Sequence, residues 1–286
     1  MQYGPAVRRR KLGTELRLLR SRVGLTSIEA ARRVGWHQSK VSRIETGSSG
    51  VKPADVQRLL DAYEVRDAEL RELLLALAGG EDGGGRQNWW HAYRGVLPPT
   101  YRDFISLESQ AGGMCTLETS VVPGLLQTPE YARAVTRAAL EGVADDKLDA
   151  LVEVRIARQD VLRADPPLRL HAILDEAVLR RRVGGPEVMA RQLARLSDAA
   201  ALPQVRLQVL PFTAGEHIGL TGPFVIFSFP NTADLDVVVL DHLTSSLYLE
   251  RKEDLQAYVE AFNALRIHAL SPGESLHYIA GIAAGA

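Results

Sequence analysis

Apolar residues recur at helical spacing through the first 78 positions. Leu12, Leu16 and Leu19 mark a first helix that ends near Gly24. Four further periodic segments follow, and their apolar positions are Ile28, Ala31 and Val34; Val41 and Ile44; Val56, Leu59, Leu60 and Tyr63; and the leucines of 67–78. The pattern predicts an all-α N-terminal domain of five short helices.

The boundaries of the second and third helices carry local signals. Thr26, with Glu29 three residues later, has the form of a capping box. Gly35 and Gly47 are placed to end the second and third helices, and the turn at Gly35 is tight. We therefore expect two helices of about two turns each, joined as in a helix-turn-helix.

A glycine-rich acidic run, Gly-Gly-Glu-Asp-Gly-Gly-Gly at 79–85, interrupts the apolar pattern. Such a run is typical of a linker. We predict a domain over 1–78, a linker over 79–86 and a larger domain over 87–286. Aromatic residues between 87 and 108, broken by Pro98 and Pro99, predict a short helix and turn that pack on the larger domain.

Both helical and strand-like patterns occur after residue 108. Helical segments cover 128–140, 147–164, 186–201 and 253–270. Short β-branched runs cover 168–174, 205–210, 224–229 and 236–240, with a possible one at 246–249. Because helices come before, between and after the strands, we expect an α+β domain with one small mixed or antiparallel sheet covered by helices.

Composition agrees with two folded domains in a reducing compartment. The 286 residues are 46% hydrophobic and 24% charged, as in ordinary globular proteins. No apolar run reaches about 18 residues and no secretory signal opens the chain, so we expect neither a membrane span nor export. Cys115 is the only cysteine, which rules out an intramolecular disulfide and fits a cytoplasmic location.

Charge is divided unevenly along the chain. Residues 1–45 hold eleven Lys or Arg and three Glu, a net +8, and the overall charge of −1 leaves −9 for the remainder. A basic head on an acidic body indicates a polyanionic partner for the head. A solvated helix face rich in arginine explains the same charge equally well.

The predicted third helix adds side chains suited to bases. It presents Gln38, Ser39, Lys40, Ser42 and Arg43 between its apolar anchors. Glutamine pairs with adenine, arginine and lysine bind guanine or phosphate, and serine serves either. The upstream arginines Arg8, Arg9 and Arg10 could add phosphate contacts. A helical hairpin that only packs does not require this polar run.

The segment from Gly24 to Gly47, with its Ser42-Arg43-Ile44-Glu45-x-Gly47, resembles the phage-repressor (Cro/C1, or XRE) helix-turn-helix family over about residues 9–77. The resemblance implies that 38–45 is the recognition helix. It departs from the family at Ser27, where glutamine is common, and at His37, where serine is common. The DNA-binding residues expected on this basis are Thr26, Ser27, His37, Gln38, Ser39, Lys40, Ser42 and Arg43.

Several segments of the larger domain extend the resemblance over nearly the whole chain. They are Val122-Pro123-Gly124-Leu125-Leu126-Gln127-Thr128-Pro129, Arg155-x-x-Arg158-Gln159, Leu174-Asp175-Glu176 and Gln208-Val209-Leu210-Pro211. Together they resemble the actinobacterial antitoxin-like family of XRE regulators. That resemblance implies a C-terminal domain of undefined chemistry and a small partner protein encoded by a neighbouring gene.

These observations predict a sequence-specific regulator that binds double-stranded DNA. One helix-turn-helix buries little surface, so we expect a homodimer whose contacts come mainly from the C-terminal domain. That domain is expected to bind the small partner protein. An alternative is a small-molecule effector, which an apolar cavity under the sheet would favour; a DNA-targeted enzyme is a third possibility.

Catalytic signals are weak in the larger domain. The spacing of His217, Asp241 and His242 matches no metal-ligand pattern, and no phosphate loop or nucleophile elbow occurs. We therefore predict no enzyme, no cofactor and no metal site. Arg155 and Arg158 are expected to pair internally with Asp175 or Glu176, the alternative being an anionic ligand.

Overall fold

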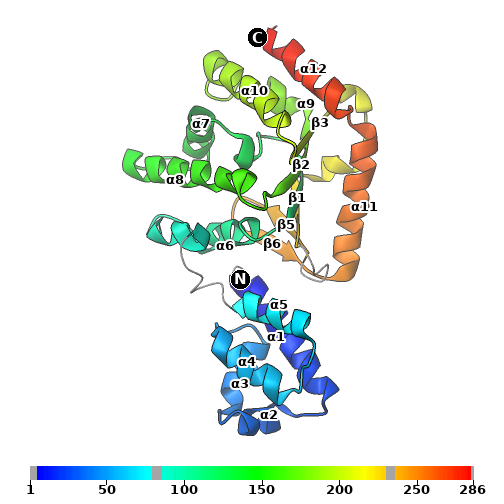
Figure 1. Cartoon of the computed structure of the whole chain (residues 1–286). Coiled ribbons are helices and arrows are strands. Elements are labelled where there is room, and N and C mark those ends of the chain that lie inside the picture. The colour runs from blue at the N-terminus through cyan, green and yellow to red at the C-terminus, as the bar shows by residue number, and fades with distance from the viewer. Residues whose placement is uncertain (1–4, 79–85, 94, 230–235, 285–286) are drawn as a thin grey trace. The chain divides into compact units, whose positions relative to one another are not determined.

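The computed structural model describes residues 5–78, 86–93, 95–229 and 236–284 (Figure 1). Packing divides the chain into an N-terminal unit, residues 1–91 with 99–104, and a C-terminal unit, residues 92–98 with 105–286. Of the expected linker, only Arg86 falls within the described residues, where it begins the 3₁₀ helix η1 (Arg86–Tyr93). The predicted boundaries at 78 and 87 stay predictions.

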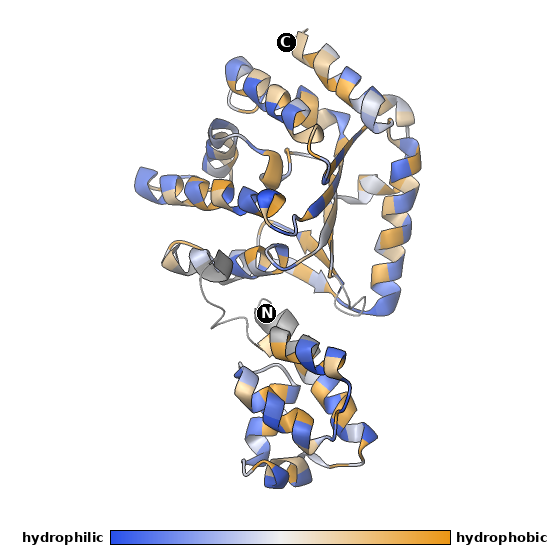
Figure 2. Ribbon diagram, in the orientation of Figure 1, coloured by the Kyte–Doolittle hydropathy of each residue, from blue (hydrophilic) through white to orange (hydrophobic). Residues whose placement is uncertain are grey.

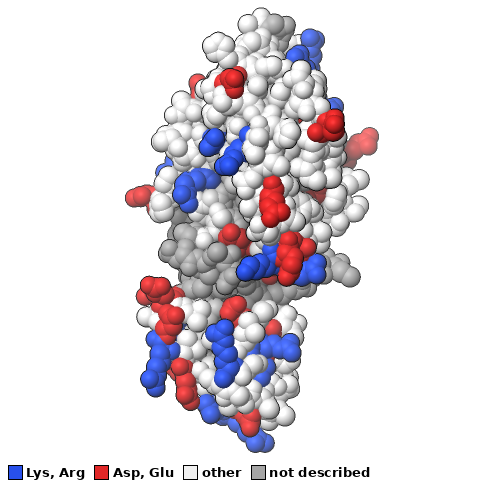
Figure 3. All heavy atoms as spheres, turned by 90° about the vertical axis from the view of Figure 1, so that its right-hand side faces the viewer, with Lys and Arg blue, Asp and Glu red and all other residues white. Residues whose placement is uncertain are grey.

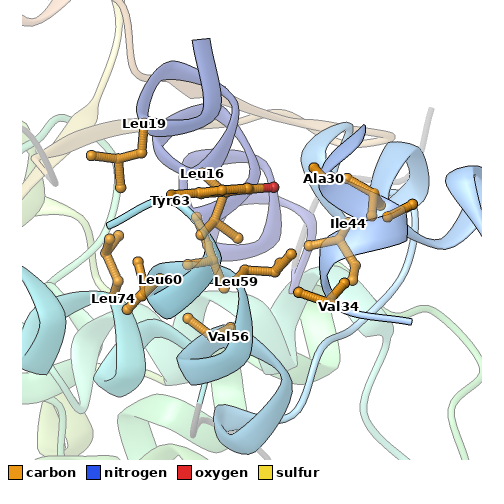
Figure 4. Packing of buried hydrophobic residues seen from close by; sticks show 13 residues of the cluster. Leu16, Leu19, Ala30, Val34, Ile44, Val56, Leu59, Leu60, Tyr63 and Leu74 are labelled. Carbon is orange, nitrogen blue, oxygen red and sulfur yellow. The ribbon is translucent and has the colours of Figure 1, made fainter. Parts of the chain in front are cut away.

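The five predicted N-terminal helices are present. They are α1 (Pro5–Arg22), α2 (Ser27–Arg33), α3 (Gln38–Glu45), α4 (Pro53–Ala62) and α5 (Ala68–Ala78). Their apolar faces meet in one core, in which Leu16, Val56 and Leu59 are completely buried (Figure 4). Burial of each such side chain stabilises the fold by roughly 1.5–3 kcal/mol.

One expected core position of α2 is wrong. Ile28 is 53% exposed, and Ala30 is buried in its place beside Ala31. On a helix of seven residues, positions 30, 31 and 34 already form the inward face, and Ile28 falls outside it.

The C-terminal unit is built on a single sheet. Its strands are β1 (Gly113–Glu118), β2 (Arg169–Asp175), β3 (Val205–Leu210), β4 (Phe224–Ser228), β5 (Val237–Asp241) and β6 (Ser246–Leu249). They lie in the order β3-β2-β1-β4-β5-β6. β1, β2 and β3 are parallel, whereas β4, β5 and β6 are each antiparallel to their neighbour, so the sheet is mixed, as expected.

Helices lie on both sides of this sheet (Figure 1). In chain order they are α7 (Pro129–Ala139), α8 (Asp145–Ala157), α9 (Glu176–Arg180), α10 (Pro186–Ala200), α11 (Lys252–His268) and α12 (Pro272–Ala284), with 3₁₀ turns η2 (Gly124–Leu126), η3 (Arg158–Arg163), η4 (Phe212–Ala214) and η5 (Ile218–Thr221). The helix α6 (Pro99–Glu108) is divided between the two units after Phe104. α11 packs Phe262 and Leu265 onto the sheet residues Leu117, Ile173 and Phe224. α7, α8 and α10 lie on the opposite side, and the orange apolar positions of the helices face inward (Figure 2). The predicted α+β architecture is confirmed.

Three elements were not expected from the pattern, namely β1, α9 and α12. β1, at the centre of the sheet, begins with Gly113, Met114 and Cys115, and Thr116 is its one β-branched residue, so its composition gives a weak strand signal. α12 contains two glycines within a weakly periodic apolar run. In addition, the helix expected over 147–164 ends at Ala157 and continues as the tighter η3.

Candidate nucleic-acid interface

Glycine permits α3 to lie directly against α1. A Cβ at Gly13 of α1 would stand 2.5 Å from the carbonyl oxygen of Ile44 and 2.7 Å from that of Glu45. Backbone atoms cannot yield as a flexible side chain can, so any larger residue at position 13 would force the two helices apart. The position of α3 on the surface therefore depends on Gly13.

An ion pair fixes the same two helices. The guanidinium of Arg20 donates from Nε and Nη2 to the two carboxylate oxygens of Glu45, at 2.7 and 2.8 Å. Its Nη1 also donates to the carbonyl of Leu25 at 2.6 Å, and the Tyr63 hydroxyl donates to Glu45 at 3.3 Å. The hydrogen bonds to Glu45 raise the pKa of Arg20. Glu45 is thus a structural residue of the helix-turn-helix.

Two local features fix the turn between α2 and α3. Gly35 has φ +67°, a backbone conformation that glycine adopts without strain. The Arg58 guanidinium donates to the carbonyl of Val34 at 2.6 Å. At the start of α2 the predicted capping box is confirmed, and the hydrogen bonds from Thr26 lower the pKa of Glu29.

With its inner face fixed, α3 leaves four polar side chains on its outer face. Gln38, Ser39 and Arg43 are exposed and Ser42 is half-buried. Within the described part of the chain, the Arg43 side chain makes no ion pair or hydrogen bond. Gln38 donates to the hydroxyl of Ser27 at 3.2 Å, which brings the first residue of α2 beside the outer face of α3. We call Gln38, Ser39, Ser42 and Arg43 the α3 face.

Lys40 points away from the α3 face. Its ammonium group lies 2.8 Å from the Asp55 carboxylate of α4 and 3.7 Å from the centre of the Trp36 ring. Both contacts hold the charge at the side of α3. The sequence pattern did not reveal this pairing, because Asp55 is fifteen residues away and belongs to another helix.

The two remaining candidates flank the helix starts. The Thr26 hydroxyl is engaged in the capping box. His37 is exposed at the N-terminus of α3, and no side chain in the described residues caps that helix. Amides at such a helix start suit a phosphate oxygen. The side chains of Arg8, Arg9 and Arg10 lie outside the described residues.

Two known family models match the chain, one near its N-terminus and one over most of the remainder. A model described as "Helix-turn-helix domain" matches residues 11–74, and one described as "Domain of unknown function (DUF5753)" matches residues 101–281. The chain belongs to the DUF5753 family. Its N-terminal region is a helix-turn-helix domain, which indicates DNA binding and transcription regulation. No curated protein and no solved structure shows significant similarity.

The DUF5753 domain turns many of its polar groups inward. Arg158 and Glu108 form a buried pair with Nε–Oε1 and Nη2–Oε2 distances of 2.8 and 2.7 Å. Arg155 donates to the side-chain oxygen of Gln127 at 3.2 Å. The expected pairing of these arginines with Asp175 or Glu176 is wrong, because Glu176 binds Arg180 and the Phe212 amide instead, and Asp175 caps α9.

Charges on the α11 face of the DUF5753 domain show no concentration of one sign. Lys and Arg are interspersed with Asp and Glu in the view over α11 (Figure 3). Among the described residues, no cluster of three or more His, Cys, Asp or Glu is placed to hold a metal ion. None of the described helices is long and apolar enough to cross a membrane.

Proposed function

We propose that this protein is a sequence-specific transcriptional regulator that binds double-stranded DNA through the α3 face. The observation that carries the proposal is the division of α3 into two sides. Val41, Ile44 and Glu45 are buried and fix the helix, while Gln38 and Arg43 are exposed. A helix fits the major groove of B-DNA, about 12 Å wide, and these amide and guanidinium groups match the edges of adenine and guanine.

We further propose that the protein binds DNA as a homodimer. The α3 face offers only four side chains, whereas specific DNA interfaces bury roughly 1,000–2,500 Å² of protein surface. Two copies would supply two recognition helices to half-sites about one helical turn apart. We propose that the dimer contacts lie in the C-terminal unit. We also propose a cytoplasmic location, where the protein would meet chromosomal DNA.

The C-terminal unit is proposed to bind a small partner protein at one end of the sheet. The pairing of Leu117 with Phe224 brings η5 to the carboxyl end of β1, and the β5–β6 turn lies at the same end. Ile218, Leu220 and Leu243 are exposed there at 50%, 72% and 96%. We propose that these three side chains together form the apolar contact with the partner.

No catalysis is proposed for this unit. Burial raises the pKa of the Cys115 thiol to about 11, so the thiol stays protonated at neutral pH. A protonated thiol is a poor nucleophile. A small-molecule effector is the second candidate, because the C-terminal unit contains a groove of ligand size, described in the next section.

The DNA-binding proposal is tested by selection from a pool of random duplexes with the full-length protein. We expect an enriched motif of two related half-sites. Gln38→Ala and Arg43→Ala should each relax base preference at one position per half-site, because direct contacts to base edges carry sequence information. Glu69→Ala on the exposed surface of α5 is the control and should leave the motif unchanged. Absence of any motif, or the same motif from all variants, contradicts the proposal.

The partner proposal has a separate test. The proposed partner is a small protein encoded by a neighbouring gene, and such a protein should co-purify with the full-length chain. Leu220→Asp and Leu243→Asp should abolish co-purification, since each places a charge in the apolar contact. Ile267→Asp, at an exposed apolar position of α11, is the matched control. Equal retention by all three variants would rule out this end of the sheet as the binding surface.

A further inference from the structure

α10 and α12 enclose a groove on the C-terminal unit. Its volume is about 870 Å³. One row of lining residues on α10 consists of Pro186, Met189 and Leu193, at helical spacing. Two rows on α12 face α10. One row is Gly273, His277 and Gly281, and the other is Glu274, Tyr278 and Ile282. Leu179 of α9 lies at the floor. The three helices lie together at the same end of the unit in Figure 1.

Two glycines of α12 widen the groove. A Cβ at Gly273 or Gly281 would meet no atom within 4 Å. Glycine in a helix interior costs roughly 1 kcal/mol relative to alanine, so Gly281 weakens α12 while it leaves this space open. Met189 and Leu193 are buried beneath it, which gives the groove an apolar floor.

Two arginines and one glutamate line the groove, and only one of the arginines has an ion pair among the described residues. Arg182 lines the groove and, within the described residues, its side chain forms no ion pair or hydrogen bond; the same holds for His277. Arg180 is held by Glu176, and its Nη2 lies 3.4 Å from the Tyr278 hydroxyl. Glu274 accepts a hydrogen bond from the Ser271 amide at 2.8 Å, which caps α12.

We propose that this groove binds a small molecule with an apolar body and a single acidic group. Pockets for such ligands span about 300–1,000 Å³, and the volume here lies within that range. The apolar body would lie on Leu179, Met189 and Leu193, and the acid would pair with Arg182 at the rim. A guanidinium binds a carboxylate or sulfonate in preference to a neutral group. The site rests on the small-molecule candidate given under the proposed function, and it does not depend on the DNA-binding proposal.

Two fluorescent probes that differ in the acid test the proposal on the full-length protein. 8-Anilinonaphthalene-1-sulfonate carries a sulfonate, and N-phenyl-1-naphthylamine has a similar apolar body without it. We expect saturable binding of the sulfonate probe with one site per chain. Gly281→Leu should weaken both probes by about tenfold or more, because the new side chain enters empty space in the groove. Ala280→Leu, at an exposed α12 position that does not line the groove, should change binding by less than about twofold.

The proposed pairing between Arg182 and the acidic group of the ligand is tested by Arg182→Gln. It should weaken the sulfonate probe by about fivefold and leave the neutral probe within about twofold, since only the charged pair is lost. Unchanged probe binding by Gly281→Leu would show that the probes do not bind in this groove. Equal effects of Arg182→Gln on both probes would show that Arg182 does not pair with the acidic group. Sedimentation tests whether a second copy of the chain occupies the groove instead. If Gly281→Leu changes the oligomeric state and Ala280→Leu does not, the groove is an interface between copies and the ligand assignment is wrong. DNA binding is not part of any readout, so failure here leaves the regulator proposal intact.

Discussion

Each unit contains an internal arginine–glutamate pair, but the two pairs have different surroundings. In the N-terminal unit Arg20 is drawn inward to join α1 and α3, and Arg43 remains on the outer face with no partner among the described residues. In the C-terminal unit Arg158 is almost fully buried against Glu108, and Arg155 turns toward Gln127. One internal ion pair holds the surface that the N-terminal unit presents outward. The buried pair of the C-terminal unit instead joins α6 to η3 in its interior, while apolar side chains and a groove lie at its surface.

Loss of the buried pair in the C-terminal unit should have the largest effect. Arg158→Met leaves the Glu108 carboxylate buried without its cation and should destabilise that unit by about 3–5 kcal/mol. Denaturant unfolding followed by circular dichroism measures the loss. The double variant Arg158→Met with Glu108→Leu should recover much of it, since no unpaired charge remains. A double variant as unstable as the single one would contradict this explanation.

The N-terminal unit should be most sensitive to substitution where α1 and α3 approach each other closely at Gly13. Gly13→Ala pushes a methyl group against the backbone of Ile44 and Glu45 and should cost about 2–3 kcal/mol. Hydrogen exchange of the α1 and α3 amides measures it. Gly281→Ala, where the added methyl meets nothing within 4 Å, should instead stabilise α12 by roughly 0.5–1 kcal/mol. If both substitutions stabilise the protein, helix propensity and not the α1–α3 contact decides the effect at Gly13.

The stability of the C-terminal unit should also depend on pH through Glu118. Burial raises the pKa of this carboxyl to about 7 from 4.5, and Asp241 adds to the shift, against a hydrogen bond from Thr116. The folded chain therefore holds a proton that the unfolded chain releases, so stability falls as pH rises from about 4.5 to 7 and then levels off.

Glu118→Gln should flatten this slope and add about 1–3 kcal/mol to the free energy of unfolding at pH 8. Urea unfolding at a series of pH values measures it. Glu141→Gln, an exposed glutamate after α7, is the control and should keep the parent slope. A slope that persists in Glu118→Gln would assign the pH dependence to another group.

The sequence predicted the N-terminal unit better because its signals are local. The Thr26–Glu29 cap, the turn at Gly35 and the spacing of Val41 and Ile44 all lie within one or two turns of each other. The position of β1 at the centre of the sheet depends on pairing with β2 and β4, whose partner residues lie more than fifty positions away. Its own composition does not reveal that placement.

The sequence predicted which polar side chains the candidate DNA interface contains, but not which of them point outward. Spacing alone identified Gln38, Ser39, Lys40, Ser42 and Arg43 as polar residues of one helix. That Lys40 pairs with Asp55 and Trp36 depends on how α4 packs, which no local pattern encodes. Likewise, the partners of Arg158 and the groove beside Gly281 arise from tertiary packing of distant helices.

The most direct test of the account compares Arg43→Ala with Lys40→Ala in affinity for the selected operator, measured by fluorescence anisotropy at fixed salt with both variants shown folded by circular dichroism. The account predicts that Arg43→Ala loses about 1–3 kcal/mol of operator binding, as expected for a lost base contact. Lys40→Ala should lose less than about 1 kcal/mol, because its charge is already paired with Asp55. If Arg43→Ala binds the operator as tightly as the parent, the α3 face is not the DNA-reading surface.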